Sequence, residues 1–230
     1  MEIIPVLDIK AGIVVHARRG TRDEYAPLQS RLTRSVQPSA VLSALLTLHP
    51  FRRVYLADLD AIGGKPSSHL PIIQELRQRF PEVEFWVDRG LADRNALTRF
   101  LEHGLGTPVL GSESLADPSL LHTPQVGQAV LSLDYRGGGL LGPQGLEQAV
   151  ADWPQRVIVM ELERVGTDAG PGLERITALR RQAPDHAFYA AGGVRDAADV
   201  RRLEQMGVKG ALVASALHQG DLSAVLVGTD

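Results

Sequence analysis

The chain has 230 residues, of which 44% are hydrophobic, and its formal net charge is −3. The interspersed charges leave no basic stripe for a nucleic acid, and the absence of cysteine excludes disulfides, thiolate metal sites and a cysteine nucleophile. No apolar run approaches the ~20 residues of a membrane span, and the first residues are typical of a strand rather than a signal segment. We therefore expect a cytoplasmic protein with no membrane or nucleic-acid partner, folded as one domain over residues 1–230.

Short apolar runs alternate along the chain with segments of helical spacing. The runs predict eight strands, at residues 3–7, 54–57, 83–87, 108–110, 129–133, 157–160, 187–190 and 211–213. Six helices are predicted between them, at residues 38–48, 68–80, 93–103, 143–152, 171–182 and 196–206. This alternation favours a parallel sheet, and eight units close a (β/α)8 TIM barrel. A doubly wound sheet is the alternative, but residues 8–12 lack its glycine-rich fingerprint.

The two halves of the sequence repeat each other at one fixed distance. Residues 54–63 align with residues 157–166, an offset of 103, and acids fall on acids. The same offset places Arg89 and Gly90 on Gly192 and Gly193. It also places Gly111 and Ser112 on Ala214 and Ser215. A period this long is not a solenoid repeat, so we expect two similar half-barrels, at about residues 1–125 and 126–230.

Two aspartates stand where a barrel carries its chemistry. Asp8 ends the first predicted strand and Asp134 ends the fifth, so both belong to the C-terminal face on opposite sides of the barrel. They are candidates for a general acid and a general base. The alternative is that each only binds the backbone amides of the loop that follows it.

Two loops suggest an anionic ligand. Residues 18–25 contain three arginines within a connection too long for an ordinary loop, so they form either a cover over the substrate or a surface insertion. Gly192 and Gly193 follow the seventh strand, where backbone amides approach a phosphate closely, and Ala214 and Ser215 after the eighth strand complete such a site. The alternative is a simple Gly-Gly turn with Asp196 as the helix cap. The seven histidines show no metal-ligand spacing, and we expect most of them at the surface.

Motifs along nearly the whole chain resemble those of the histidine-biosynthesis barrel family, which includes a ribotide isomerase and its cyclase paralogue. The motifs are Ile3-Ile-Pro-Val-Leu-Asp8-Ile9, Tyr55-Leu-Ala-Asp-Leu-Asp60, Leu133-Asp-Tyr-Arg136, Gly166-Thr167 and Ala191-Gly-Gly-Val194. The versions around Asp8 and Asp134 are closer to the isomerase. The resemblance implies an Amadori rearrangement of a phosphoribosyl amine that needs no metal or organic cofactor.

The same resemblance implies roles for individual residues. Asp134 would be the acid that opens the sugar ring, and Asp8 the base that removes the C2 proton. Substrate and phosphate contacts would come from Asp58, Arg89, Gly90, Gly111, Ser112, Gly166, Thr167, Gly192, Gly193, Ala214 and Ser215. The partner is a phosphorylated small molecule, and we expect a monomer or a small homo-oligomer.

The departures from the family pattern concern the first phosphate loop. Asp88 and Arg89 occupy positions where the isomerase has small residues and a glycine, and Met160 replaces a polar substrate contact. We expect the first phosphate pocket to be narrower than the second, with Arg89 available for a bidentate contact and Asp88 repelling an anion unless it is paired. A divergent family branch is linked to one-carbon (methanopterin-type) cofactor synthesis. Three interpretations therefore stay open: the isomerase, a family enzyme acting on a singly phosphorylated substrate, and a barrel that binds a ligand or partner without catalysis.

Overall fold

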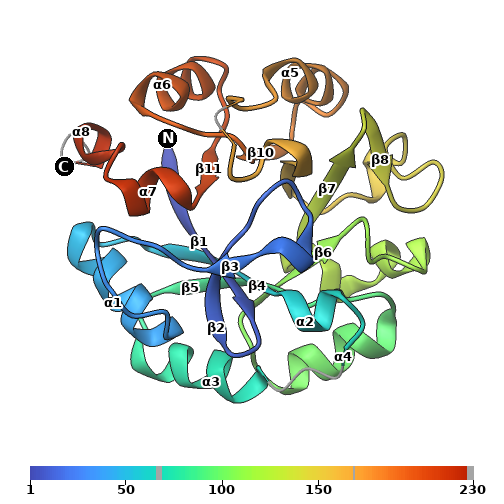
Figure 1. Cartoon of the computed structure of the whole chain (residues 1–230). Helices are drawn as coiled ribbons and strands as arrows, with labels where there is room; N and C mark the ends of the chain where they lie inside the picture. Colours follow the sequence, from blue (N-terminus) through green and yellow to red (C-terminus); the bar gives the residue numbers. More distant parts are fainter. Residues whose placement is uncertain (66–68, 168, 227–230) are drawn as a thin grey trace.

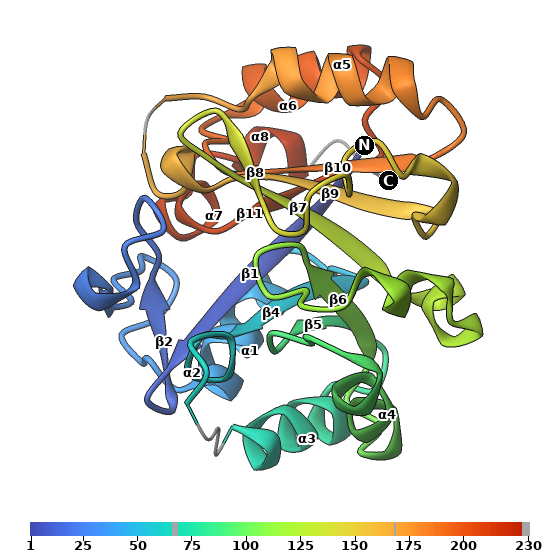
Figure 2. The same cartoon turned by 90° about the vertical axis from the view of Figure 1, so that its right-hand side faces the viewer.

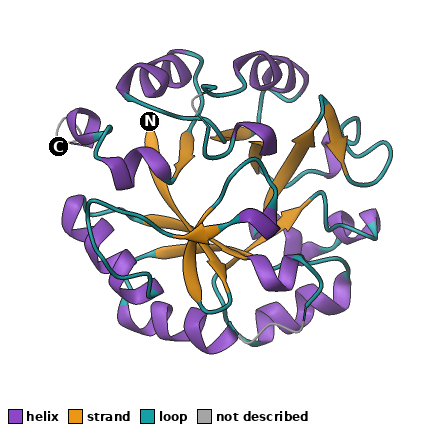
Figure 3. Cartoon of the chain, viewed as in Figure 1, coloured by secondary structure: helices purple, strands orange, loops and turns teal. Residues whose placement is uncertain are grey.

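A computed structural model describes residues 1–65, 69–167 and 169–226 of the chain. Eight parallel strands close into a (β/α)8 barrel with helices around it (Figures 1 and 3). The strands are β1 (Glu2–Lys10), β4 (Arg53–Asp58), β5 (Glu84–Asp88), β6 (Thr107–Gly111), β7 (Val130–Arg136), β9 (Arg156–Glu161), β10 (Ala187–Ala191) and β11 (Gly210–Val213). The barrel closes where Glu2 of β1 pairs with Gly210 of β11. The predicted fold class and all eight predicted strands are confirmed.

The helices lie outside the barrel, with α3 and α4 on one side and α5 and α6 on the other (Figure 2). They are α1 (Pro38–Leu48), α2 (Leu59–Ile62), α3 (Leu70–Arg79), α4 (Arg94–Glu102), α5 (Leu173–Gln182), α6 (Ala197–Gln205), α7 (Ser215–Gln219) and α8 (Ser223–Leu226). Five of the six predicted helices correspond to α1, α3, α4, α5 and α6, although the predicted start of the second, Ser68, lies outside the described residues. None of the described helices is long and apolar enough to cross a bilayer.

The helix predicted at residues 143–152 is wrong. That segment forms turns and one short 3-10 helix, η4 (Val150–Asp152). Gly142 and Gly145 have φ angles of +139° and +85°, which are incompatible with an α-helix, and a Cβ at Gly142 would lie only 2.5 Å from the carbonyl oxygen of Ser112. Glycine is therefore required here for close approach to the loop after β6. The spacing of apolar residues predicts a helix, but it carries no information about this tertiary contact.

Two layers of apolar side chains form the core, because alternate residues of each strand point into and out of the barrel. The outer layer packs the strands against the helices. The inner layer fills the barrel and includes Trp86 and Tyr189, whose rings meet edge to face at 4.8 Å. Arg53 and Arg156 stack over Trp86 from the N-terminal side, so that end of the barrel is plugged. The open end is therefore the C-terminal face.

Further short elements lie on the connections. They are β2 (Ile13–His16), η1 (Arg22–Glu24) and β3 (Ala26–Pro27) in the long connection after β1, η2 (Pro118–His122) and η3 (Pro124–Gln128) after β6, β8 (Gly139–Leu141) after β7, and η5 (Leu162–Arg164) after β9. The connection after β1 folds back over the barrel because β2 pairs antiparallel with β1.

Candidate active site

One cavity opens at the C-terminal ends of the strands, with an empty volume of about 940 Å³ including its mouth. Its walls come from both halves of the barrel. Asp8 at the end of β1 and Asp134 at the end of β7 both line it. The two aspartates that the sequence placed on opposite sides of the barrel therefore face the same space.

Both carboxyl groups are buried, and burial dominates their charge state. The exposed fraction is 9% for Asp8 and 5% for Asp134, and desolvation raises the pKa of each to about 7. Asp134 is hydrogen-bonded by Ser132 Oγ at 2.6 Å and by the Glu113 amide at 3.2 Å. No described residue donates a hydrogen bond to the Asp8 carboxyl. Each group is thus close to half-protonated near neutral pH, as acid–base catalysis requires.

A third buried carboxyl, Asp88 at the end of β5, lies in the same cavity. It accepts hydrogen bonds from Tyr55 Oη at 3.1 Å and from the Gly90 amide at 3.0 Å. Burial raises its pKa to about 6, and its charge in turn raises the pKa of both Asp8 and Asp134. Asp88 is therefore electrostatically coupled to both candidate catalytic groups.

The long connection after β1 covers the cavity, which it lines with Gly20, Arg22 and Tyr25. Arg22 forms an ion pair with Glu113 of the loop after β6, on another side of the mouth. The amide of Arg19 donates to the carbonyl of Val165 at 2.9 Å, so the cover is also attached to the loop after β9. The segment predicted as a substrate cover is folded over the mouth in this structure.

The C-terminal half contributes a wall of small residues, which we call the glycine cradle: Gly166, Thr167, Gly192, Gly193, Ala214 and Ser215. Gly192 and Gly193 have φ angles of +95° and +80°. A Cβ at Gly193 would lie 2.3 Å from the carbonyl oxygen of Gly170, so a side chain is excluded. The cradle thus exposes backbone to the cavity, as an anion site requires.

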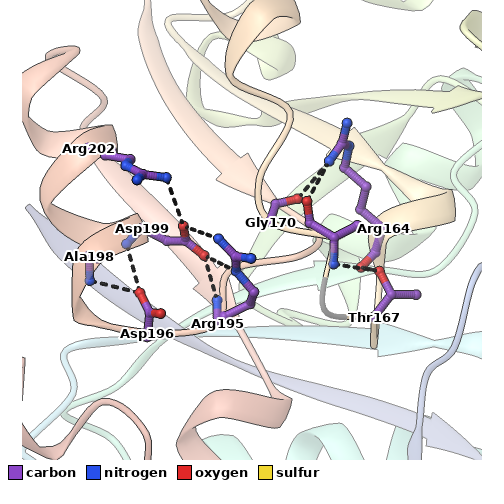
Figure 4. Close-up of polar contacts among 9 residues, drawn as sticks. Arg164, Thr167, Gly170, Arg195, Asp196, Ala198, Asp199 and Arg202 are labelled. Atoms are coloured by element: carbon purple, nitrogen blue, oxygen red, sulfur yellow. Dashed lines mark hydrogen bonds and ion pairs between the residues drawn. The ribbon is translucent and has the colours of Figure 1, made fainter.

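Polar contacts behind the cradle hold its loops in place (Figure 4). Asp196 caps α6 by accepting from the amides of Ala198 and Asp199. The Arg195 guanidinium binds the buried Asp199 carboxylate through two nitrogens, at 2.8 and 2.9 Å. In the neighbouring loop, Arg164 donates to the carbonyl of Gly170 at 3.0 Å. Asp196 is therefore the N-cap of α6. The Gly192–Gly193 turn precedes this cap, so both features are present.

The corresponding residues of the N-terminal half do not line the cavity: Asp58, Arg89, Gly90, Gly111 and Ser112 are absent from its walls. Arg89 Nε donates to Asp58 Oδ2 at 2.9 Å. Ser112 is fully buried and accepts from the Asp134 amide at 2.8 Å. Gly111 lies beneath the acids, because a Cβ there would be 3.3 Å from both Asp88 Oδ2 and Asp134 Oδ2. The described residues of this half support the carboxyl groups and present no second cradle.

Five of the seven histidines are exposed or partly exposed, as expected, but two are buried. His103 and His122 are exposed, but His69 and His218 are almost fully buried and His16 is half-buried. His69 Nδ1 lies 2.8 Å from Asp58 Oδ1, and its Nε2 accepts from the Gly12 amide at 2.9 Å. Sequence spacing could not reveal this pairing, since Asp58 and His69 are 11 residues apart and belong to no shared motif.

Sequence reasoning assigned no role to two polar cavity residues, Tyr55 and Glu113. The position of Tyr55 on β4, three residues before Asp58, could have identified it, because its side chain points into the barrel. Met160 also lines the cavity, at the position where the family pattern has a polar substrate contact.

Acidic side chains around one cavity at the C-terminal mouth of a closed barrel define a (β/α)8-barrel enzyme site. The family model described as "Histidine biosynthesis protein" matches residues 2–223, so the chain belongs to this family.

Three relatives illustrate the range within the family. An uncharacterized protein of Methanocaldococcus jannaschii is 31% identical over 228 residues, covering 96% of this chain and 95% of the relative. A protein of Roseiflexus castenholzii, also 31% identical, covers 97% of this chain and 96% of its own length. A protein of Bordetella avium is 27% identical, with 96% and 94% covered. The last two are named 1-(5-phosphoribosyl)-5-((5-phosphoribosylamino)methylideneamino) imidazole-4-carboxamide isomerases.

Proposed function

We propose that the protein is a ribotide-isomerase-like enzyme that catalyses an Amadori-type aldose–ketose isomerisation of a phosphorylated sugar amine, as an intramolecular oxidoreductase without a cofactor. The observation that carries this proposal is the pair Asp8 and Asp134 in one cavity, both with a pKa raised to about 7. The names of the isomerase relatives support the reaction class.

The chemistry needs one proton donor and one proton acceptor on opposite sides of a sugar. Asp134 donates a proton to the ring oxygen, the C1–O bond breaks, and the nitrogen lone pair forms the imine. Asp8 then removes the C2 proton to give the enolamine, which tautomerises to the aminoketose. Ser132 and the Glu113 amide hold the Asp134 carboxyl in position, while Asp8 keeps its oxygen atoms available to the substrate.

The direct test is turnover of the aminoaldose on which the named isomerases act. The purified protein is incubated with this compound and the aminoketose is measured, and in parallel the gene is tested for rescue of a histidine auxotroph that lacks the isomerase. Conversion and rescue support the histidine-biosynthesis reaction. If a folded preparation converts none of the substrate, that substrate is excluded.

A second candidate is a family enzyme that acts on a singly phosphorylated sugar amine, for example in one-carbon cofactor synthesis. The specific observation in its favour is that only the glycine cradle opens onto the cavity, whereas Arg89 is engaged by Asp58 and Ser112 is buried. Turnover of a monophosphorylated ribosyl amine, with no turnover of the bis-phosphorylated compound, distinguishes this candidate. The non-catalytic barrel is excluded by turnover of either.

The two repeat-related serines provide a matched pair for the phosphate site. Ser215→Ala is expected to weaken the binding of inorganic phosphate about tenfold, because it removes one hydrogen bond to a charged group. Ser112→Ala is expected to leave phosphate affinity unchanged, since that hydroxyl is bonded to Asp134 and does not reach the cavity wall. Isothermal titration calorimetry measures both. Equal losses in the two variants contradict the single-cradle interpretation.

The pH dependence of turnover follows from the two raised pKa values. Below about pH 7 Asp8 becomes protonated and cannot accept the C2 proton, and above about pH 7 Asp134 loses the proton it must donate. We expect kcat/KM to be maximal near pH 7 and to fall on both sides, with apparent values that belong to the coupled Asp8, Asp88 and Asp134 carboxyls together. A profile that is flat between pH 5 and pH 9 contradicts this assignment.

A further inference from the structure

The cavity has two chemically opposite walls. The glycine cradle lies on the loops after β9, β10 and β11. Facing it are four acids from the ends of β1, β5 and β7 and from the loop after β6, which we call the acidic wall: Asp8, Asp88, Glu113 and Asp134. Among the described residues that line the cavity, Arg22 is the only lysine or arginine, and it is already paired with Glu113.

The acidic wall is unsuited to a phosphate. A second phosphate there would stand beside buried carboxyl groups in surroundings where like charges repel strongly. Arg89, the cation that a phosphate would need, is turned to Asp58 and does not line the cavity. Among the described residues no group of three or more acids and histidines is arranged to hold a metal ion, so the wall is not built around one.

One member of the wall points to a ligand of the opposite charge. Asp8 is more than nine-tenths buried, lines the cavity and receives no hydrogen bond from any described residue. The Asp8 carboxyl therefore opens into the cavity with its acceptor capacity unused by the protein, so a ligand there can supply the donor. Asp88 has two donors, Tyr55 and Gly90, but a carboxylate accepts about four hydrogen bonds, so capacity remains on the same wall.

We propose that the acidic wall is a subsite for an amino group, so that the enzyme recognises a sugar monophosphate whose end opposite the phosphate carries a primary amine. This inference rests on the proposed function, because it takes the glycine cradle as the phosphate site. Asp88 sets the specificity: its carboxylate lies in the cavity wall at the end of β5, directly before Arg89, and Gly111 provides the room for it beside Asp134.

The experiment compares two sugar phosphates that differ only in the amine. 1-Amino-1-deoxyfructose 6-phosphate and fructose 6-phosphate, in which the amine replaces the C1 hydroxyl at the end opposite the phosphate, are titrated calorimetrically into the wild-type protein at pH 8. The amine is expected to bind about tenfold more tightly, the effect of one charge-assisted hydrogen bond. Equal affinities overturn the amine subsite and leave the cradle intact. Binding of neither sugar overturns the cradle, and with it both the proposed function and this inference.

Two further arms assign the preference to Asp88. In Asp88→Asn the amine preference is expected to disappear while fructose 6-phosphate binds as in the wild type. Glu82→Gln, an exposed acid just before β5, is expected to retain the preference. An unchanged preference in Asp88→Asn contradicts the role of that residue.

Independently of any variant, fructose 1,6-bisphosphate is expected to bind the wild type no more tightly than fructose 6-phosphate. Tighter binding of the bisphosphate overturns the proposal.

Discussion

Asp8→Asn and Asp134→Asn are each expected to lower kcat by about 10²- to 10⁴-fold, the usual contribution of one general acid or base. Asn keeps the shape of the side chain but neither accepts the C2 proton nor donates to the ring oxygen. Steady-state assays with the substrate identified by the turnover test measure the effect. The double variant is expected to be little worse than either single variant, because the two groups act in one reaction sequence.

The control for this experiment separates chemistry from binding and folding. Inorganic phosphate is expected to bind both variants as it binds the wild type, since neither aspartate belongs to the glycine cradle. Glu82→Gln serves as the matched acid-to-amide change on an exposed residue. Full turnover by either active-site variant, with a circular dichroism spectrum like that of the wild type, would remove that aspartate from the mechanism.

Asp8→Asn is also expected to make the protein more stable than the wild type at pH 8. The Asp8 pKa is about 7 in the folded protein, against a value of 3.8 for the exposed group, so the folded state binds the proton more tightly. The stabilising effect of that proton is complete below the unfolded-state pKa and is lost as pH rises through the folded-state pKa. Asn does not titrate, so its free energy of unfolding lacks this loss.

The size of the effect follows from the linkage between proton binding and folding. Between about pH 5 and pH 8 the wild type is expected to lose about 2 to 3 kcal/mol relative to Asp8→Asn, or roughly 5–10 °C in Tm. Thermal melts at the two pH values measure the difference, and Asp88 and Asp134 titrate in both proteins. A stability difference that does not change with pH, or one that favours the wild type at pH 8, contradicts a buried, uncompensated Asp8 carboxyl.

The sequence contained enough information for the barrel and for its central acids. Parallel strands of a barrel are buried on both faces, so they appear as continuous apolar runs, and the residue that follows each run falls at a known end of the barrel. Asp8 and Asp134 were identified as candidates in this way, and both line the cavity. The glycine pair after β10 followed from the same rule.

What the sequence could not provide were contacts between residues distant along the chain. Arg89 was a candidate phosphate ligand, but it pairs with Asp58, which lies 31 residues earlier. Asp88 was expected to repel an anion, and its buried position beside Tyr55 and the electrostatic coupling to both catalytic candidates depend on the barrel's closure. The failed helix at residues 143–152 has a local origin instead: Gly145 inside the segment has a φ angle of +85°, while Gly142, which approaches Ser112, precedes the segment.

The offset of 103 residues also has a consequence for chimeric barrels. Among the described residues the cradle belongs to the second half alone, and Asp88 belongs to the first. A fusion of two copies of residues 126–230 would carry two glycine cradles and lack Asp88. A fusion of two first halves would contain two copies of Asp88 and no cradle. A cavity with the glycine cradle on one side and Asp88 on the other therefore requires one copy of each half.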